Sequence, residues 1–208
     1  MIERWRHHWN RRQLRNQAYA YLFEPCRKDE VVVLDTETTG LNPRRDAILS
    51  VGAVVIKDGK IQINHAFERL VRPERDISEE SIKIHRLRSC DLAQAESAET
   101  VIQDLLAFIK NRPIVGYYIR FDHAIVSRYT RSLIGVSLPN PMIELSSMYY
   151  RRFRKHSAYE MVDLKFDTMM QTLGIPMLGK HDALNDALMS AMMYLKLKSM
   201  PEYKGAYA

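Results

Sequence analysis

The sequence is poor in cysteine, in glycine and in long apolar runs. Its 208 residues include only two cysteines, Cys26 and Cys90, and neither belongs to a Cys-x-x-Cys motif. This excludes a disulfide framework, argues against a thiolate zinc site and is typical of a reducing, cytoplasmic setting. No apolar run approaches the ~20 residues that a membrane-spanning helix needs, so we expect no membrane insertion. With eight Gly and eight Pro, the chain is not fibrous or of low complexity.

Basic residues are in excess, and the excess is concentrated at the N-terminus. The formal net charge is +6, and residues 1–28 alone hold seven basic and two acidic residues, a net of +5. Such a segment is typical of polyanion binding, for example to nucleic acid, and equally of a solvated helix without a partner. Arginines interrupt any apolar stretch there, which excludes a secretory signal. We predict a basic helical extension over residues 1–28 and a folded domain over residues 29–208.

Apolar periodicity changes along the chain from strand-like to helix-like. The expected strands are residues 31–34, 47–56, 60–71, 114–116 and 142–145. The expected helices are residues 4–23, one starting at Ser78, 97–110, 122–134, 163–173 and 182–197. Asp58-Gly59 is a strong hairpin signal between the second and third strands. This order predicts an α/β fold, in which helices flank a mixed five-stranded sheet with a three-stranded antiparallel part and further parallel strands.

Two carboxylates follow the first apolar strand. Asp35 and Glu37 are two residues apart, so along an extended chain their side chains point to the same face. At ~4 Å and an effective dielectric constant of ~20, their repulsion amounts to about 4 kcal/mol. A neutralising cation is therefore expected beside them. Taken alone, Asp-x-Glu is also typical of a solvated strand end.

Two further acidic patterns lie at expected helix starts. Asp122 follows Phe121 at the beginning of the helix 122–134, where an N-cap is the simplest interpretation. Near the C-terminus, Asp182 is the expected N-cap of the last helix. His181 then lies in the preceding loop, and Asp186 lies one turn inside the helix. Each pattern alone is common at the surface of helical proteins.

In this order and context, the three patterns resemble the DEDDh 3′→5′ exonucleases, the family of the proofreading epsilon subunit of bacterial DNA polymerase III, ribonuclease T and oligoribonuclease. The resemblance extends from about Val31 to about Lys198, and its strongest part is Leu34-Asp35-Thr36-Glu37-Thr38-Thr39-Gly40-Leu41. His181 stands where a sister group has Tyr. The resemblance implies a ribonuclease H-like fold. One departure is Tyr118, since the family usually has Asn four residues before the second-motif Asp.

The resemblance also implies the chemistry. Two divalent ions, Mg²⁺ or Mn²⁺, clamp the attacking and leaving oxygens of a phosphodiester. The implied metal ligands are Asp35, Glu37, Asp122 and Asp186, and the implied catalytic residues are His181, as general base, and Glu37. The implied substrate-binding residues are Thr38, Thr39, Gly40, Leu41 and His85. His85 belongs to Ile84-His85-Arg86-Leu87, in which Arg86 replaces the usual Gly.

The implied activity is metal-dependent 3′→5′ exonucleolysis of single-stranded or frayed DNA 3′ ends, releasing nucleoside monophosphates. An exoribonuclease and a non-catalytic nucleic-acid-binding module remain alternatives, because the motifs alone do not show whether the substrate carries deoxyribose or ribose. The implied partners are a single-stranded DNA 3′ end, with RNA as the alternative, and a DNA polymerase subunit or other protein bound through residues 1–28. Residues 149–156 interleave aromatic and cationic side chains, which is typical of single-strand binding and of an amphipathic helix.

Overall fold

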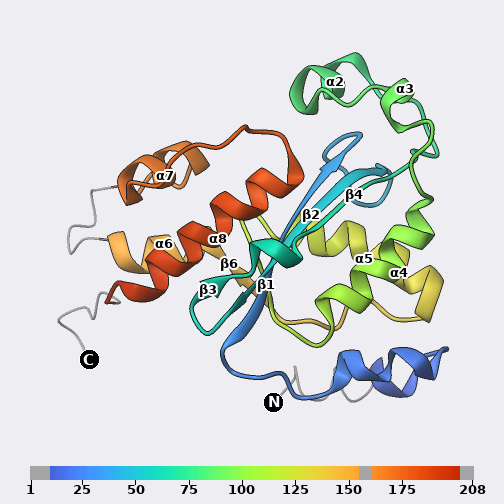
Figure 1. Cartoon of the computed structure of the whole chain (residues 1–208), viewed down its shortest axis with the longest axis horizontal. Helices are drawn as coiled ribbons and strands as arrows, with labels where there is room; N and C mark the ends of the chain where they lie inside the picture. The colour runs from blue at the N-terminus through green and yellow to red at the C-terminus, as the bar shows by residue number, and fades with distance from the viewer. Residues whose placement is uncertain (1–9, 155–160, 202–208) are drawn as a thin grey trace.

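The structure, a computed structural model, describes residues 10–154 and 161–201. A six-stranded mixed sheet runs through the centre, with helices on both faces (Figure 1). The strands are β1 (Glu30–Thr38), β2 (Ile48–Lys57), β3 (Lys60–Ile61), β4 (Phe67–Leu70), β5 (Ile114–Gly116) and β6 (Met142–Glu144). The predicted mixed α/β architecture is confirmed.

The sheet joins an antiparallel half to a parallel half. β1 pairs antiparallel with β2, and β2 pairs antiparallel with β3 and β4. On its other edge β1 pairs parallel with β5, and β5 pairs parallel with β6. The predicted hairpin turn is confirmed, with positive φ angles of 50° at Asp58 and 73° at Gly59. The predicted third strand, 60–71, is two strands, because a 3₁₀ turn, η2 (Ile63–His65), interrupts it; the sheet therefore has six strands instead of five.

The helices begin and end close to the predicted positions. They are α2 (Glu79–His85), α3 (Ser89–Leu92), α4 (Ala98–Ile109), α5 (Arg120–Ile134), α6 (Leu145–Phe153), α7 (Phe166–Leu173) and α8 (Ala183–Ser199). The side chains of Ser78, Ser97 and Asp182 cap α2, α4 and α8 as expected. The prediction missed α3. α6 covers residues 149–153 of the stretch 149–156 for which an amphipathic helix was one alternative, and residues 155 and 156 lie outside the described part. Within the described part of the chain, no helix is long and apolar enough to span a membrane.

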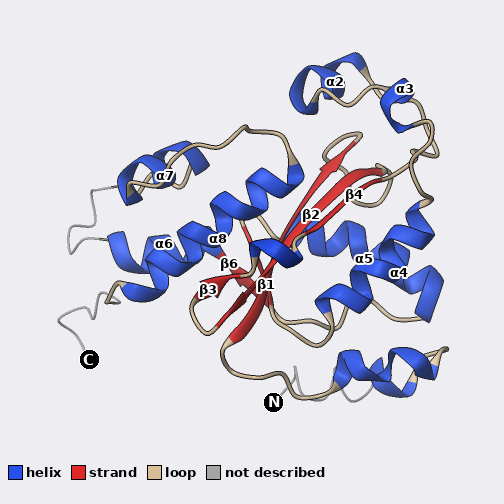
Figure 2. Cartoon of the chain, viewed as in Figure 1, coloured by secondary structure: helices blue, strands red, loops and turns tan. Residues whose placement is uncertain are grey.

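The two faces of the sheet pack against different helices (Figure 2). Val32 and Leu34 of β1 belong to the apolar cluster that also contains buried residues of α4 and α5. Val31 and Val33 belong to a second cluster, which contains buried residues of α6, α7 and α8. Alternation along β1 thus assigns every second side chain to the α8 side of the sheet.

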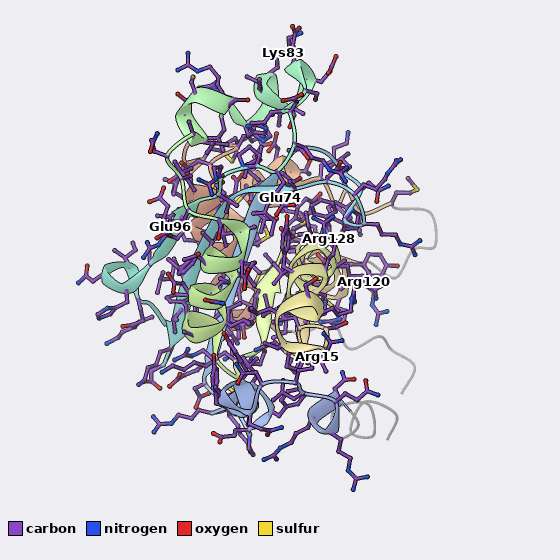
Figure 3. The ribbon with its side chains drawn as sticks, turned by 90° about the vertical axis from the view of Figure 1, so that its right-hand side faces the viewer. Arg15, Glu74, Lys83, Glu96, Arg120 and Arg128 are labelled. Carbon is purple, nitrogen blue, oxygen red and sulfur yellow. The ribbon has the colours of Figure 1, made fainter. Side chains whose placement is uncertain are left out.

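The N-terminal segment differs from the prediction of one helix over residues 4–23. Residues 1–9 lie outside the described part, and residues 10–12 are helical as predicted. The helix then ends, and a 3₁₀ helix, η1 (Gln17–Phe23), starts after its N-cap Asn16. Leu14, Leu22 and Phe23 are buried in the cluster that α4 and α5 share. The Arg15 backbone N–H donates to the Ile134 carbonyl at the end of α5, and Figure 3 shows Arg15 below that helix. The described part of this segment therefore packs on the body, and the division at residue 28 stays a prediction.

Candidate active site

The carboxyl end of β1 carries the first two acidic side chains. Continuing the alternation from Val31 and Val33, Asp35 and Glu37 face the α8 side of the sheet. Glu37 is only 9% exposed. The prediction that both carboxylates share a face is consistent with this register, and the face is the one on which α8 begins (Figure 1).

The start of α8 brings a third carboxylate and the histidine to that face. Asp182 caps α8 by accepting a hydrogen bond from the Asn185 N–H at 2.9 Å. One turn later, the Asp186 carboxylate accepts the backbone N–H of His181 at 3.1 Å. His181 has a positive φ of 60° and is exposed, so its ring lies at the surface while its backbone is fixed to Asp186. Ligand atoms of Glu37, His181 and Asp186 lie within 4.8 Å of one another.

The fourth carboxylate, Asp122, belongs to α5, which packs on the opposite face of the sheet from α8. α5 begins at Arg120, so Asp122 is its third residue and not its N-cap. Its side chain is 5% exposed, and one carboxylate oxygen accepts the Thr36 hydroxyl hydrogen at 2.6 Å. Thr36 stands between Asp35 and Glu37 on β1, so Asp122 is held at the same strand end from the α5 side.

The pKa values of these groups show that they share one electrostatic environment. Burial, followed by the charges of Asp122, Asp186 and Glu37, raises the pKa of Asp35 well above its ordinary value. Burial and the charges of Asp186 and Asp122 raise the pKa of Glu37 to about 7. Burial also raises the pKa of Asp122 to about 7, although the Thr36 hydrogen bond opposes the shift. The carboxylates therefore repel one another without a cation between them.

This donor set suits hard divalent cations. Carboxylate oxygens are the ligands that Mg²⁺ and Mn²⁺ prefer, and two such ions balance four carboxylate charges. Among the described residues, Glu37, His181 and Asp186 form the one group of three or more acidic, His or Cys side chains with metal-ligand spacing. Asp35 and Asp122 extend this group through their mutual charge interaction.

The loop after β1 presents an apolar tip beside the carboxylates. The Thr38 hydroxyl donates to the Gly40 carbonyl at 2.7 Å, and the Thr39 hydroxyl accepts the Ala47 N–H at 3.0 Å. A Cβ on Gly40 would lie 2.6 Å from an Asp46 carboxylate oxygen, so a larger residue here would displace the Asp46 side chain. Leu41 follows and is 91% exposed. The loop is thus closed by its own hydrogen bonds, with one large apolar side chain projecting from it.

Arg128 of α5 holds the far side of the same loop. Its guanidinium donates to the Pro43 carbonyl at 3.2 Å and to the Asp46 carbonyl at 2.6 Å. It also lies over the Tyr129 ring, 4.8 Å from the centroid. Figure 3 shows Arg128 and Arg120 beside α5, the helix that begins at Arg120. The loop that carries Leu41 is therefore anchored to the helix that carries Asp122.

Sequence comparison identifies the family. The sequence model of the exonuclease family (RNase_T, described as "Exonuclease") matches residues 32–194, which include all four carboxylates and His181. The chain belongs to this exonuclease family. The family is of the DEDD 3′→5′ type and depends on divalent metal ions, and the chain is an exonuclease domain. The resemblance seen in the motifs is thereby confirmed.

Relatives of this exonuclease domain include bacterial replication proteins. A PolC-type DNA polymerase III from Thermotoga petrophila is 32% identical over 187 residues, which cover 90% of this chain and 13% of that protein. A DNA polymerase III epsilon subunit from Aquifex aeolicus is 25% identical over 169 residues, covering 80% of this chain and 79% of that one. The exonuclease domain thus spans about an eighth of the length of the PolC-type relatives.

Solved structures confirm the predicted ribonuclease H-like exonuclease fold. E. coli exonuclease I, in complex with a dT13 oligonucleotide, superposes with a TM-score of 0.69 at 15% identity, covering 83% of this chain and 42% of that one. Exonuclease X, in complex with duplex DNA that has a 5′ overhang, gives a TM-score of 0.61 at 22% identity, covering 80% and 90%. At these identities the likeness establishes the fold.

His85 lies close to the site, but both of its ring nitrogens already have hydrogen-bond partners within the protein. Its Nε2 lies 2.7 Å from the Ser81 hydroxyl, which donates to the Thr38 carbonyl at 3.0 Å, and its Nδ1 accepts the Leu87 N–H at 3.0 Å. The side chain is 5% exposed, and burial lowers its pKa. His85 therefore connects α2 to the end of β1, and its predicted contact with substrate stays a prediction.

One acidic residue of the site escaped the sequence analysis. Glu144 ends β6, and its Oε1 accepts hydrogen bonds from the Tyr118 N–H at 3.0 Å and from the Ser146 N–H and hydroxyl. Its charge contributes to the raised pKa of Asp122. The signal was the same as for Asp35, namely an acidic residue at the carboxyl end of a strand.

Proposed function

We propose that this exonuclease domain removes nucleotides one at a time from single-stranded or frayed DNA 3′ ends. In the proposal, Asp35, Glu37, Asp122 and Asp186 hold two divalent ions, Mg²⁺ or Mn²⁺. The observation that carries it is the meeting of these carboxylates from β1, α5 and α8 beside His181. The ions would supply charge neutralisation and an acidified water.

His181 is the proposed general base. Its exposed ring on a positive-φ loop leaves imidazole accessible, while the N–H bond to Asp186 keeps it beside the carboxylates. A neutral imidazole accepts the proton of the attacking water near pH 7. The water oxygen bonds to phosphorus, the bond from phosphorus to the 3′ oxygen breaks, and a nucleoside monophosphate leaves. Glu37 would orient the same water.

Strand-end recognition is assigned to the loop after β1. Thr38, Thr39 and Gly40 would contact the terminal nucleotide through their backbone, and Leu41 would pack on its base. The 91% exposure of Leu41 on an anchored loop supports this role, since an isolated apolar side chain held in water is available for a ligand. DNA is favoured over RNA because the relatives are DNA polymerase III proteins.

A DNA polymerase subunit is the proposed protein partner, bound through residues 1–28, and the proposed location is the cytoplasm. The support is that the relatives are replication proteins, some of them much longer than this chain. Size-exclusion chromatography with the catalytic polymerase subunit of the same cell tests the partner. Co-elution that persists without residues 1–9 would place the contact at residues 10–28 or elsewhere on the domain.

Digestion of 5′-labelled DNA and RNA oligonucleotides tests the function. We expect a ladder that shortens from the 3′ end in Mg²⁺ or Mn²⁺, and no digestion in EDTA. Asp35→Asn should abolish it, whereas Asp104→Asn, an exposed carboxylate on α4, should leave it intact. Faster digestion of RNA would favour the exoribonuclease. Intact strands in every metal, with equal binding by wild type and Asp35→Asn, would favour a non-catalytic binding module.

A further inference from the structure

Tyr118 is an exposed aromatic residue at the edge of the proposed active site. It occupies the turn between β5 and α5 and is 61% exposed. Its φ is +51°, a left-handed conformation that is unfavourable for a residue with a bulky side chain. Four other non-glycine residues of the described chain have positive φ, and His181 of the proposed site is one of them. Such strain tends to be retained where it holds a group that a ligand uses.

The backbone and the ring of Tyr118 are both held by specific contacts. Its N–H donates to the Glu144 carboxylate at 3.0 Å, and its carbonyl accepts the Phe121 N–H at 2.9 Å. Its ring meets that of Tyr117 edge-on, with centroids 4.5 Å apart. Tyr117 in turn contacts the Phe166 ring at 5.1 Å and donates its hydroxyl hydrogen to the Leu164 carbonyl. The Tyr118 ring is therefore ordered before any ligand arrives, while most of its surface stays in water.

The position of Tyr118 favours one side of the scissile phosphate. Tyr118 lies one turn before Asp122, and its N–H bonds to Glu144, whose charge reaches Asp122. Tyr118 therefore lies at the Asp122 end of the carboxylate group, whereas Glu37, His181 and Asp186 meet at the other end. In an in-line displacement the attacking and leaving oxygens lie on opposite sides of phosphorus. With the water activated at His181, the leaving 3′ oxygen lies toward Asp122. That oxygen belongs to the nucleotide next to the terminal one.

We propose that the Tyr118 ring is a stacking subsite for a nucleobase on the 5′ side of the scissile phosphate, at the second or third nucleotide from the 3′ end. The inference rests on the proposed function, because it uses the direction in which the strand enters. Every base has a π face, so the subsite accepts any sequence and distinguishes a base from a missing base. It would hold the shortened strand after each cleavage, when the terminal nucleotide has gone.

Abasic scanning tests the subsite by binding. Fluorescent single strands, each with one abasic residue at a known distance from the 3′ end, are titrated with the full chain in EDTA, so that no strand is cut. For the wild type we expect the loss of affinity to be largest at the second or third position, by roughly 5- to 100-fold. Tyr118→Ala should bind the intact strand more weakly by the same factor, and its affinity should no longer depend on the position of the abasic residue. An unchanged profile in Tyr118→Ala overturns the proposal.

Three further variants separate stacking from folding. Tyr118→Phe should keep the wild-type profile. Tyr118→Leu, which keeps apolar bulk, and Tyr118→Asn, which tolerates positive φ, should both lose it while each variant keeps a single cooperative thermal unfolding transition. Ile63→Ala removes an apolar side chain of similar exposure, 60% against 61%, on η2 and is the matched control. Wild-type position dependence in Tyr118→Leu would overturn the proposal.

Digestion in Mg²⁺ distinguishes a failure of the proposed exonuclease function from a failure of the Tyr118 subsite. If the wild type shortens 3′ ends while Tyr118→Ala shows equal KM and an equal abasic profile, the proposed function stands and the subsite is wrong. If the wild type leaves every 3′ end intact and its binding shows no position dependence, both are wrong.

Discussion

Gly52 of β2 lies directly against the backbone of Ala183, the first residue of α8. A Cβ built on Gly52 would be 2.2 Å from the Ala183 carbonyl carbon and oxygen and 2.3 Å from the Leu184 nitrogen. Gly52 is also the residue paired with Asp35 across the β1–β2 ladder. The absence of one side chain therefore allows α8 to start beside Asp35, and Asp186 follows one turn later.

Gly52→Ala should displace the start of α8 and damage the site. The clash is with backbone atoms, which cannot yield as a side chain can, so we expect a loss of roughly 1–3 kcal/mol in the free energy of unfolding. Displacement of Asp186 by about 1 Å should lower hydrolysis by roughly 100-fold. Urea denaturation and digestion rates measure the two effects. Gly179→Ala is the control, since its Cβ would be in ordinary contact, 3.4 Å from Asn185; equal effects of both variants would contradict this account.

The metal-free domain should lose stability as the pH rises from about 4.5 to about 7. The pKa of Glu37 is raised from 4.5 to about 7, so the folded state holds its proton more tightly than the unfolded state. That contribution is fully present below about 4.5 and is lost as the pH passes 7. Thermal melts in EDTA should therefore show a higher melting temperature at pH 5.5 than at pH 8. Glu37→Gln should make this dependence shallower without removing it, because the pKa of Asp122 is also raised to about 7; an unchanged slope would show that Glu37 does not contribute.

Divalent metal should restore the stability that is lost at high pH. Mn²⁺ or Mg²⁺ competes with protons for the same oxygens, so binding should be tighter at pH 8 than at pH 5.5. A ligand at 100 times its Kd stabilises the folded state by about 2.7 kcal/mol, which raises the melting temperature by several degrees. Differential scanning calorimetry at both pH values measures this. A melting temperature insensitive to millimolar Mn²⁺ at pH 8 would argue strongly against the proposed ligands.

Arg128→Ala should loosen the loop that carries Leu41. Its hydrogen bonds to Pro43 and Asp46 are charge-assisted, and loss of about 1.5 kcal/mol of loop ordering corresponds to about a tenfold higher KM. Because Arg128 touches none of the four carboxylates, kcat should change little. Steady-state digestion of a short oligonucleotide separates the two constants. Arg131→Ala, on the same helix, should alter neither; an equal fall in kcat and kcat/KM for Arg128→Ala would contradict a loop role.

Deleting residues 1–26 should unfold the domain instead of merely weakening nucleic-acid binding. The deletion removes Leu14, Leu22 and Phe23, which are buried in the core, and each buried apolar side chain contributes roughly 2–5 kcal/mol. The basic charge of the segment is tested better by Arg11→Glu, an exposed position that should leave the melting temperature unchanged. We expect weaker oligonucleotide affinity and a shallower salt dependence, whereas Lys60→Glu on the β2–β3 hairpin should change neither.

The chain order of the elements and the identity of the acidic motifs could be predicted from the sequence, because they depend on local properties. Alternation along a strand places Asp35 and Glu37 on one face, a side-chain cap starts α8 at Asp182, and Asp58-Gly59 turns the β2–β3 hairpin. The helix predicted over residues 4–23 and the single strand over 60–71 were wrong. In the first, the Arg15 N–H bonds to the distant Ile134 carbonyl, and in the second, local 3₁₀ hydrogen bonds at Ile63–His65 interrupt the strand.

Whether the acidic groups meet depends on how the layers of the fold pack together. Parallel pairing of β5 with β1 brings Asp122 to Thr36, and the close approach of Gly52 to Ala183 brings Asp186 and His181 to Glu37. Burial then raises the carboxylate pKa values, an effect that depends on surrounding atoms and not on residue order. Residue order alone specifies which chemical groups are present and which way each points along its own element. Packing between layers determined the distances on which their shared charge depends.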